Sequence, residues 1–173
     1  MGVVIDESKI ILLDADVIIH FIKGDRLGIL TEIFPNKYGI LDFVFNEVFK
    51  GNLRIQVENL IRFKRVIEVP FDESLEVKKE FASLKKRYGL GESACMAYCK
   101  FHKEVFASSN LADIKPYCEA NGIKYITTMD LLAEAFKNGL LTATECDNFI
   151  VLVKSKGSKL PVNNIQEFLR ANP

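Results

Sequence analysis

The sequence predicts an α/β fold, a three-layer sandwich in which helices cover both faces of a central, mostly parallel β-sheet. Short runs of β-branched and other apolar residues, such as 9–13 and 104–107, have the length and continuity of strands buried on both faces. Between such runs lie segments with apolar residues at helical spacing, such as 73–88. Strands that alternate with helices form right-handed βαβ units, and these units build a parallel sheet.

The elements can be assigned in order from these patterns and from their breaking residues. Asp14 interrupts the first apolar run, and Gly24 follows the helix after it. Pro70 stops the third strand, the glycines around Leu90 separate two helices, and Gly122 caps a later helix. We therefore expect strands at 9–13, 38–45, 66–69, 104–107 and 124–127, and helices at 15–22, from about 46, 57–63, 73–88, 92–101, 110–120 and 130–137.

The C-terminal segment has a different pattern. Thr142 and Glu145 form the spacing of a capping box, which predicts a helix at 142–153. A loop rich in Lys and Ser follows at 154–159, and a last short helix is expected at 164–169. We predict an α/β domain over 1–140 and a helical extension over 141–173 packed on the same domain.

Charge and cysteine content exclude several classes of protein. The chain has 173 residues, with 23 Lys plus Arg and 23 Asp plus Glu, so its formal net charge is zero. A protein that holds nucleic acid by bulk charge is excluded, and any such binding needs locally separated charge. A membrane span is not expected because no apolar stretch is long enough. The four cysteines do not form a disulfide framework, which favours a cytoplasmic location.

Acidic residues recur where predicted strands pass into helices. Asp14 ends the first strand, Glu47 lies just beyond the second, Glu92 begins a helix, and Asp113 lies in the first turn after the 104–107 strand. Taken singly, each is explained as a helix cap or as an acid favoured by the helix dipole. Capping does not require all of them to share one edge of a sheet, however, and the carboxyl ends of parallel strands do share one.

Carboxylates gathered without basic partners repel one another, and a hard divalent cation relieves that repulsion. Mg²⁺ or Mn²⁺ is the expected cofactor. Two such ions about 3.5–4 Å apart activate water and stabilise a leaving oxygen in phosphodiester cleavage.

Four motifs in order make the chain resemble the PIN-domain ribonucleases. Leu12 to Ile18 is similar to their opening motif, an apolar strand followed by Asp-x-Asn and two aliphatic residues. Asn46-Glu47-Val48 is similar to the second acidic motif, and Gly91-Glu92 with the small residues after it to the third. Ser108 to Ile114, followed by 122–127, resembles the fourth block. The resemblance covers about residues 9–140.

The resemblance implies a role for particular residues. Asp14, Glu47 and Glu92 match acidic metal-site positions, and Ser109 matches a Ser or Thr that supports the site, with Asn110 beside it. Two positions depart from the family pattern. Asp16 stands where Asn is usual and adds a carboxylate, and Leu111 occupies the place of the fourth acid. Asp113, two residues further on, is the candidate replacement.

The activity implied by the resemblance is metal-dependent endonucleolytic cleavage of single-stranded RNA. The basic run Lys85-Lys86-Arg87 leads toward Glu92 and is a candidate contact for the RNA backbone. VapC-type toxin nucleases belong to the same family, so a small antitoxin is a candidate partner, and a homodimer is left open. If Asp113 does not replace the fourth acid, the chain is instead a PIN-fold binding module whose catalytic site has decayed.

A second enzyme class stays open. Asp14-Ala15-Asp16-Val17 also resembles the nucleophile motif of haloacid-dehalogenase-like phosphatases, in which Asp14 would attack phosphorus. That class also needs a later Lys and a paired acidic motif, which this chain does not clearly provide. Cys95, Cys99 and His102 share one helix face, but their apolar neighbours favour core packing over zinc binding. The sequence has neither a P-loop nor a Gly-x-Ser-x-Gly elbow.

Overall fold

The computed structural model describes residues 2–173, and its centre is a five-stranded parallel sheet. The strands lie in the order β3-β2-β1-β4-β5, and each pair of neighbours is parallel. Their bounds are β1 (Ile10–Leu13), β2 (Lys37–Leu41), β3 (Ile67–Val69), β4 (Val105–Ala107) and β5 (Tyr125–Ile126). The predicted fold class is confirmed.

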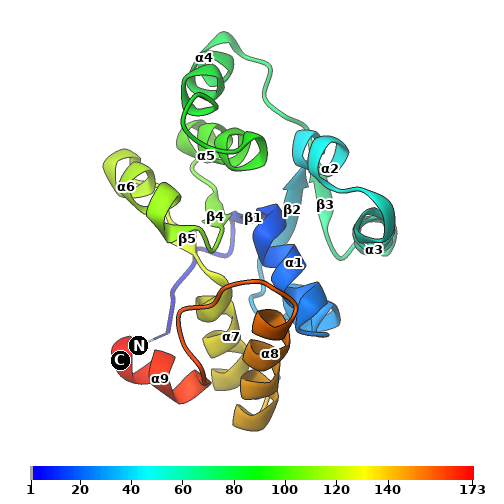
Figure 1. Cartoon of the computed structure of the whole chain (residues 1–173). Helices are drawn as coiled ribbons and strands as arrows, with labels where there is room; N and C mark the ends of the chain where they lie inside the picture. Colours follow the sequence, from blue (N-terminus) through cyan, green and yellow to red (C-terminus); the bar gives the residue numbers. More distant parts are fainter. Residues whose placement is uncertain (1) are drawn as a thin grey trace.

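Helices cover both faces of this sheet. The chain runs outward from β1 to β3 and then crosses back to β4, so right-handed crossovers put the later helices on the opposite face. In Figure 1, α4, α5 and α6 lie above the sheet, whereas α1 lies below it. The bounds of the first six helices are α1 (Ala15–Lys23), α2 (Asp42–Val48), α3 (Gly51–Arg62), α4 (Leu75–Leu84), α5 (Leu90–His102) and α6 (Leu111–Asn121).

The second strand is shorter than predicted. It ends at Leu41, and Asp42 already begins α2, so the expectation of a strand through Phe45 is wrong. A carboxylate oxygen of Asp42 accepts the backbone N–H of Phe43 at 2.6 Å, which satisfies one donor at the start of the helix, and also that of Phe71, after β3, at 3.0 Å. Val44 and Phe45 are buried on the inner side of that helix. A continuous apolar run fits a buried helix as well as a buried strand.

One 3-10 helix, η1 (Leu27–Glu32), was not predicted. The helix expected at 57–63 begins earlier, at Gly51, and other helix ends differ by a few residues from the expected bounds. The core itself is built around β1, in which Ile11, Leu12 and Leu13 have no exposed surface. Within residues 2–173, no helix is both long enough and apolar enough to cross a lipid bilayer.

The three C-terminal helices pack on one another, and α8 packs against α1. They are α7 (Thr128–Lys137), α8 (Ala143–Ser155) and α9 (Ile165–Ala171). The rings of Phe21 in α1 and Phe149 in α8 lie 5.1 Å apart between centroids, and the Nζ of Lys23 donates to the Oγ of Ser158 at 2.8 Å. In Figure 1, α7 and α8 lie on the same side of the sheet as α1.

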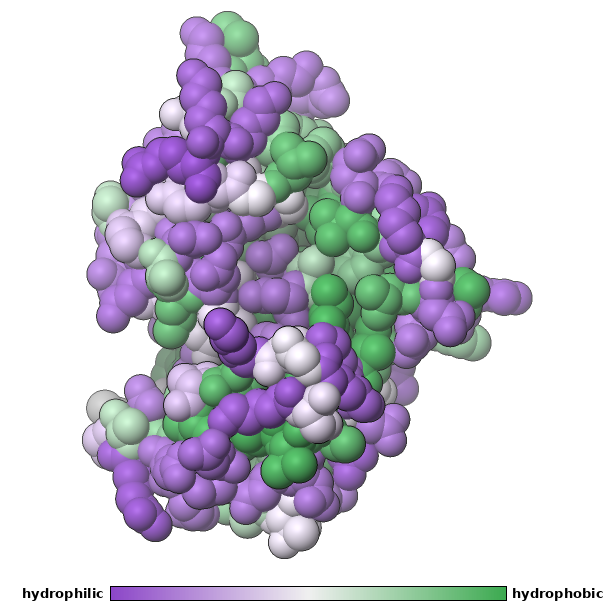
Figure 2. Space-filling model, in the orientation of Figure 1, coloured by the Kyte–Doolittle hydropathy of each residue, from purple (hydrophilic) through white to green (hydrophobic). Residues whose placement is uncertain are grey.

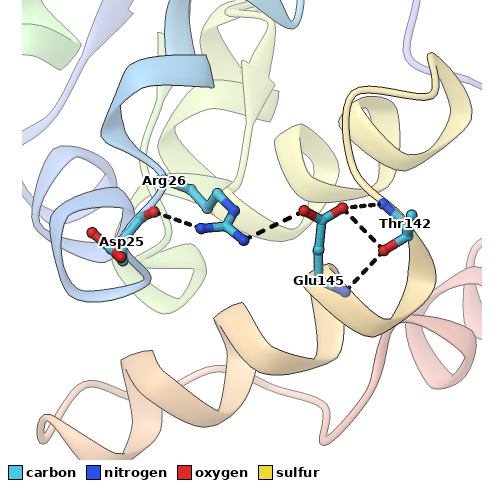
Figure 3. A network of polar contacts seen from close by, with 4 residues as sticks. All are labelled: Asp25, Arg26, Thr142 and Glu145. Atoms are coloured by element: carbon cyan, nitrogen blue, oxygen red, sulfur yellow. Dashed lines mark hydrogen bonds and ion pairs between the residues drawn. The ribbon is translucent and has the colours of Figure 1, made fainter.

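A polar network joins the start of α8 to the end of α1 (Figure 3). Thr142 and Glu145 form the predicted capping box, in which the Oγ1 of Thr142 accepts the N–H of Glu145. The Oε2 of Glu145 belongs to this capping box, and its Oε1 lies 3.5 Å from Nη2 of Arg26, which follows α1. The guanidinium of Arg26 also donates to the carbonyl of Asp25 at 2.9 Å. The cap of α8 is therefore tied to the α/β body.

Replacing Gly24 tests how tightly α8 packs on α1. A Cβ at this position would overlap the ring of Phe149, whereas a Cβ at Gly28 has nothing within 4 Å. We expect Gly24→Ala to lower the free energy of unfolding by about 1–3 kcal/mol through overpacking. The control Gly28→Ala should leave it nearly unchanged. Urea denaturation of both variants measures the difference, and equal effects would contradict this packing.

Candidate metal centre

Asp14 lies at the carboxyl end of the central strand. Its backbone N–H donates to the carbonyl of Ala107 at 2.9 Å, so it joins the ends of β1 and β4. The residue is also the N-cap of α1, and its Oδ1 accepts the N–H of Ala15 at 2.8 Å. Only 7% of its surface is exposed. The cap that the sequence suggested is present, and it holds the carboxylate at this edge of the sheet.

Asp16 lies in the first turn of α1 and faces the loop after β4. Its Oδ2 accepts the backbone N–H of Ser109 at 2.8 Å and the hydroxyl of Ser108 at 3.4 Å. Its Oδ1 is buried and has no hydrogen-bond partner. A buried carboxylate oxygen without a donor is costly, so this oxygen is a candidate ligand atom.

Asn110 connects the carboxylates of Glu92 and Asp113. Its Nδ2 donates to Oε1 of Glu92 at 3.0 Å and to Oδ2 of Asp113 at 2.7 Å. Glu92 belongs to the first turn of α5 and is 8% exposed, whereas Asp113 belongs to the first turn of α6 and is half-buried. The amide thus brings Asp113 to Glu92.

Burial raises the pKa of three of these carboxyl groups, those of Asp14, Asp16 and Glu92. Burial, together with the negative charges of Asp16 and Glu92, raises the pKa of Asp14 to about 8. Burial and the charge of Asp113 raise the pKa of Glu92 to about 7, although the amide of Asn110 lowers it. Burial also raises the pKa of Asp16, and its bond from Ser109 opposes this. None of these four carboxylates has an ion pair among the described residues.

The donor set fits a hard divalent cation. The four carboxylates, which we call the acidic cluster (Asp14, Asp16, Glu92 and Asp113), offer oxygen ligands, and the Oδ1 of Asp16 is free to bind. Between residues 2 and 173, however, no three His, Cys, Asp or Glu side chains are already arranged around one ion. The amide of Asn110 occupies the space between Glu92 and Asp113. Binding an ion therefore requires these side chains to turn away from Asn110.

Glu47 and Leu111 are placed differently from the cluster. Glu47 is exposed near the end of α2, and no hydrogen bond or ion pair links it to the cluster in the described chain. The side of α2 nearest Asp14 carries Val44 and Val48, whose methyl groups lie against Gly91. Leu111 is the first residue of α6 and is 41% exposed. Of the predicted ligands, the structure brings together Asp14, Glu92 and Asp113, with Asp16 beside them.

The basic residues expected near the site lie in the turn before α5. Lys85, Lys86 and Arg87 are all exposed, and none forms an ion pair with a carboxylate of the described chain. Lys85 and Arg87 lie over the rings of Phe81 and Tyr88. Positive charge therefore stands at the N-terminal approach to the helix that carries Glu92.

The surface around the acidic cluster is divided in character. Figure 2 shows hydrophilic atoms between α5 and α1, and hydrophobic atoms in the hollow bordered by α1, α2 and α3. A hollow of about 520 Å³ between η1 and α3 is lined by Leu27, Leu60 and Phe63 among others, and shares no residue with the acidic cluster. Its lining contains no carboxylate, so we place the chemistry at the sheet edge.

The cysteines and one histidine have structural surroundings. Cys95 and Cys99 are completely buried, and burial raises the pKa of both thiols well above its usual value. The Nε2–H of His102 instead donates to the carboxylate of Asp72 at 2.8 Å, and the imidazole stacks on Tyr98. These three side chains do not form a zinc site in the described chain.

Sequence reasoning missed Thr128, which begins α7 and bonds to Ser109. The sequence does contain a signal for it, because Thr128 follows a predicted strand directly, just as Asp14 does. The hydroxyl of Thr128 also lies 2.8 Å from Nδ1 of His20, a buried residue of α1.

Comparison with known families decides the assignment. A family model described as a PIN domain matches residues 10–172. The chain belongs to the PIN-domain family. A search of curated proteins gives no significant match. The family match extends through α9, beyond the region of the motif resemblance. PIN domains have a nuclease-type fold and generally use divalent metal ions, in keeping with the oxygen-rich cluster.

Proposed function

We propose that this PIN domain is a metal-dependent endonuclease that cleaves single-stranded RNA. The observation that carries the proposal is the acidic cluster: carboxylates from α1, α5 and α6 meet at one edge of the sheet without a basic partner. Structural ion pairs would normally accompany buried carboxylates, because uncompensated charge is costly. An unpaired cluster in a family that uses divalent ions supports a Mg²⁺ or Mn²⁺ site.

Asp14, Asp16 and Glu92 are the residues that would hold the cation, with Asp113 as the fourth acid in place of Leu111. A bound divalent ion supplies charge neutralisation at the phosphate and activates water for attack. The protein itself fixes the carboxylates: the α1 N-cap holds Asp14, and the N–H of Ser109 holds Asp16. Asn110, released from Glu92, has an amide suited to a phosphate oxygen.

The basic turn supports RNA as the substrate. Lys85, Lys86 and Arg87 are exposed and unpaired with carboxylates of the described chain, so they are available to phosphates on either side of the scissile bond. Because the net charge is zero, such binding depends on this local separation of acid and base. Glu47 is exposed near the end of α2, so we do not include it among the proposed metal ligands.

Cleavage of a labelled single-stranded RNA in Mn²⁺ tests the proposal. We expect the wild type to cleave the RNA and Glu92→Gln to be at least about 100-fold less active. Mutating a residue that only supports a metal ligand already lowers metal affinity or activity by roughly 10–100-fold. Glu58→Gln, at an exposed site on α3, is the matched control and should keep full activity.

Two other results would contradict the proposal. A wild type that cleaves no RNA in Mg²⁺ or Mn²⁺ would favour a decayed binding module. Turnover of a phosphomonoester, with trapping of a phosphoaspartate analogue at Asp14, would favour the phosphatase alternative. The toxin role and its antitoxin stay predictions, and a small neighbouring reading frame with a DNA-binding pattern would support them.

A further inference from the structure

Two residues of α1 are linked to Ser109 by hydrogen bonds, Asp16 directly and His20 through Thr128. Asp16 accepts the backbone N–H of Ser109 at 2.8 Å. His20, one helical turn further on, reaches the side chain of Ser109 through Thr128: its Nδ1 lies 2.8 Å from Oγ1 of Thr128, which lies 2.6 Å from Oγ of Ser109. Residues four apart on a helix share one face, so both contacts come from the same side of α1.

The protons of this chain of hydrogen bonds can be assigned. The backbone N–H of Thr128 donates to Oγ of Ser109 at 3.0 Å, and the Ser109 hydroxyl donates to Oγ1 of Thr128. In this arrangement the hydroxyl proton of Thr128 points to Nδ1 of His20, which accepts it. The arrangement requires a neutral His20 that carries its proton on Nε2.

The surroundings of His20 fit this assignment. The imidazole is 6% exposed, and Thr128 has no exposed surface. Burial, with the positive charge of Lys23, lowers the pKa of His20 to about 4, so the ring is neutral near pH 7. A buried hydroxyl that loses its partner is destabilised, so Thr128 depends on this acceptor.

We propose that His20 is a positioning residue for the metal centre: through Thr128 it fixes Ser109, and thereby the carboxylate of Asp16. Both donors to Asp16 fall on Oδ2, which leaves Oδ1 buried and unbonded for a cation. If the loop carrying Ser109 shifts, this orientation is lost. The inference rests on the proposed metal site, and nothing in the family motifs includes His20.

Substitutions at His20 and Thr128 separate this role from simple core packing. His20→Leu and Thr128→Val keep the volume but remove the hydrogen bond. His20→Asn places an amide near the position of Nδ1, and Thr128→Ser keeps the hydroxyl. Both variants should therefore preserve the hydrogen bonds from residue 20 through residue 128 to Ser109. Asn36→Leu is the matched control, because Asn36 is 5% exposed and bonds the carbonyls of Asp6 and Lys9 at the opposite end of β1.

Mn²⁺ affinity, measured by electron paramagnetic resonance, is the deciding readout, with the melting temperature recorded for each variant. We expect a loss of about tenfold or more in His20→Leu and Thr128→Val. Near wild-type affinity is expected in His20→Asn and Thr128→Ser, and in Asn36→Leu despite its lower stability. The double variant His20→Leu/Thr128→Val should bind no worse than either single one. Unchanged affinity in His20→Leu, or an equal loss in Asn36→Leu, would overturn the proposal.

Two NMR measurements on the metal-free protein do not depend on metal binding. The imidazole of His20 should carry its proton on Nε2, and a proton on Nδ1 would overturn the assignment. Amide exchange of Ser109 should be about tenfold faster in His20→Leu and unchanged in Asn36→Leu, and unaltered exchange in His20→Leu would reject the proposal. A wild type that binds no Mn²⁺ would refute the proposed function, while the exchange experiment would still decide whether His20 positions Ser109.

Discussion

Asp14→Asn is expected to abolish both RNA cleavage and the stabilisation of the protein by Mn²⁺. Asparagine keeps the acceptor that caps α1, where Oδ1 takes the N–H of Ala15, but it removes the most deeply buried charge of the acidic cluster. We expect activity to fall by about 100-fold or more, because even groups that only support a metal ligand account for roughly 10–100-fold. The rise in melting temperature that Mn²⁺ gives the wild type should disappear.

The same variant should be more stable than the wild type when no metal is present at pH 8. The wild-type carboxylate is buried beside Asp16 and Glu92, which raises its pKa to about 8. Removing it relieves this cost, by more than about 1 kcal/mol, since one pKa unit corresponds to roughly 1.4 kcal/mol. A destabilised Asp14→Asn protein would mean that Asp14 acts mainly as a structural cap.

Asp147→Asn is the matched control for this substitution. Asp147 also accepts one backbone N–H, that of Ile165 at 2.8 Å, but it lies in α8. We expect this variant to keep its response to Mn²⁺ and its nuclease activity. Differential scanning fluorimetry with and without Mn²⁺, and cleavage of labelled RNA, measure both proteins. An equal loss of the Mn²⁺ response in the control would contradict the assignment of Asp14.

The metal-free wild type is expected to lose stability as the pH rises from about 6.5 to 8.5. The pKa values of Asp14 and Glu92 rise on folding, from 3.8 to about 8 and from 4.5 to about 7. At a pH between the unfolded and folded pKa values of each group, the folded state binds more protons than the unfolded state. Stability therefore falls with increasing pH. The loss is complete once the pH passes the folded value of Asp14.

The chosen window avoids the opposite contribution of His20. Burial lowers the pKa of His20 from 6.5 to about 4, so this residue adds stability as the pH rises toward 6.5 and adds no more above it. Urea denaturation at several pH values, in a metal chelator and in excess Mn²⁺, gives the two curves. We expect Mn²⁺ to flatten the decline, because a cation favours ionised carboxylates. A metal-free stability that rises from pH 6.5 to 8.5 would refute the buried acidic cluster.

Much of the fold could be predicted from the sequence because its signals are local. The apolar run before Asp14, the helical spacing of 73–88 and the Thr142–Glu145 capping box each depend on neighbouring residues, and the corresponding elements are present. The end of β2 was misplaced because Phe43, Val44 and Phe45 are apolar in either structure. The start of the helix is marked by Asp42, whose carboxylate also accepts the N–H of Phe71, a residue 29 positions further on.

The candidate site was predictable only in part for the same reason. Asp14, Glu92 and Asp113 follow from the rule that parallel strands end at one edge, and the structure brings them together. The exposed position of Glu47 could not be read from its spacing, because it depends on which face of α2 packs against Gly91. The link from His20 through Thr128 to Ser109 could not be predicted either. Thr128 lies 108 positions from His20 and 19 positions from Ser109 in the sequence.

The sequence by itself determined the α/β class, the family and the acidic character of the sheet edge, because periodicity, strand ends and short motifs are properties of neighbouring residues. Only the tertiary structure decided which oxygens are bonded and which are free. Oδ2 of Asp16 is held by the loop after β4 and Oδ1 is left buried without a partner, since α1, α6 and α7 converge there from distant parts of the chain. Hydrogen bonding and burial depend on that convergence, and they set the pKa values and the candidate ligand atoms.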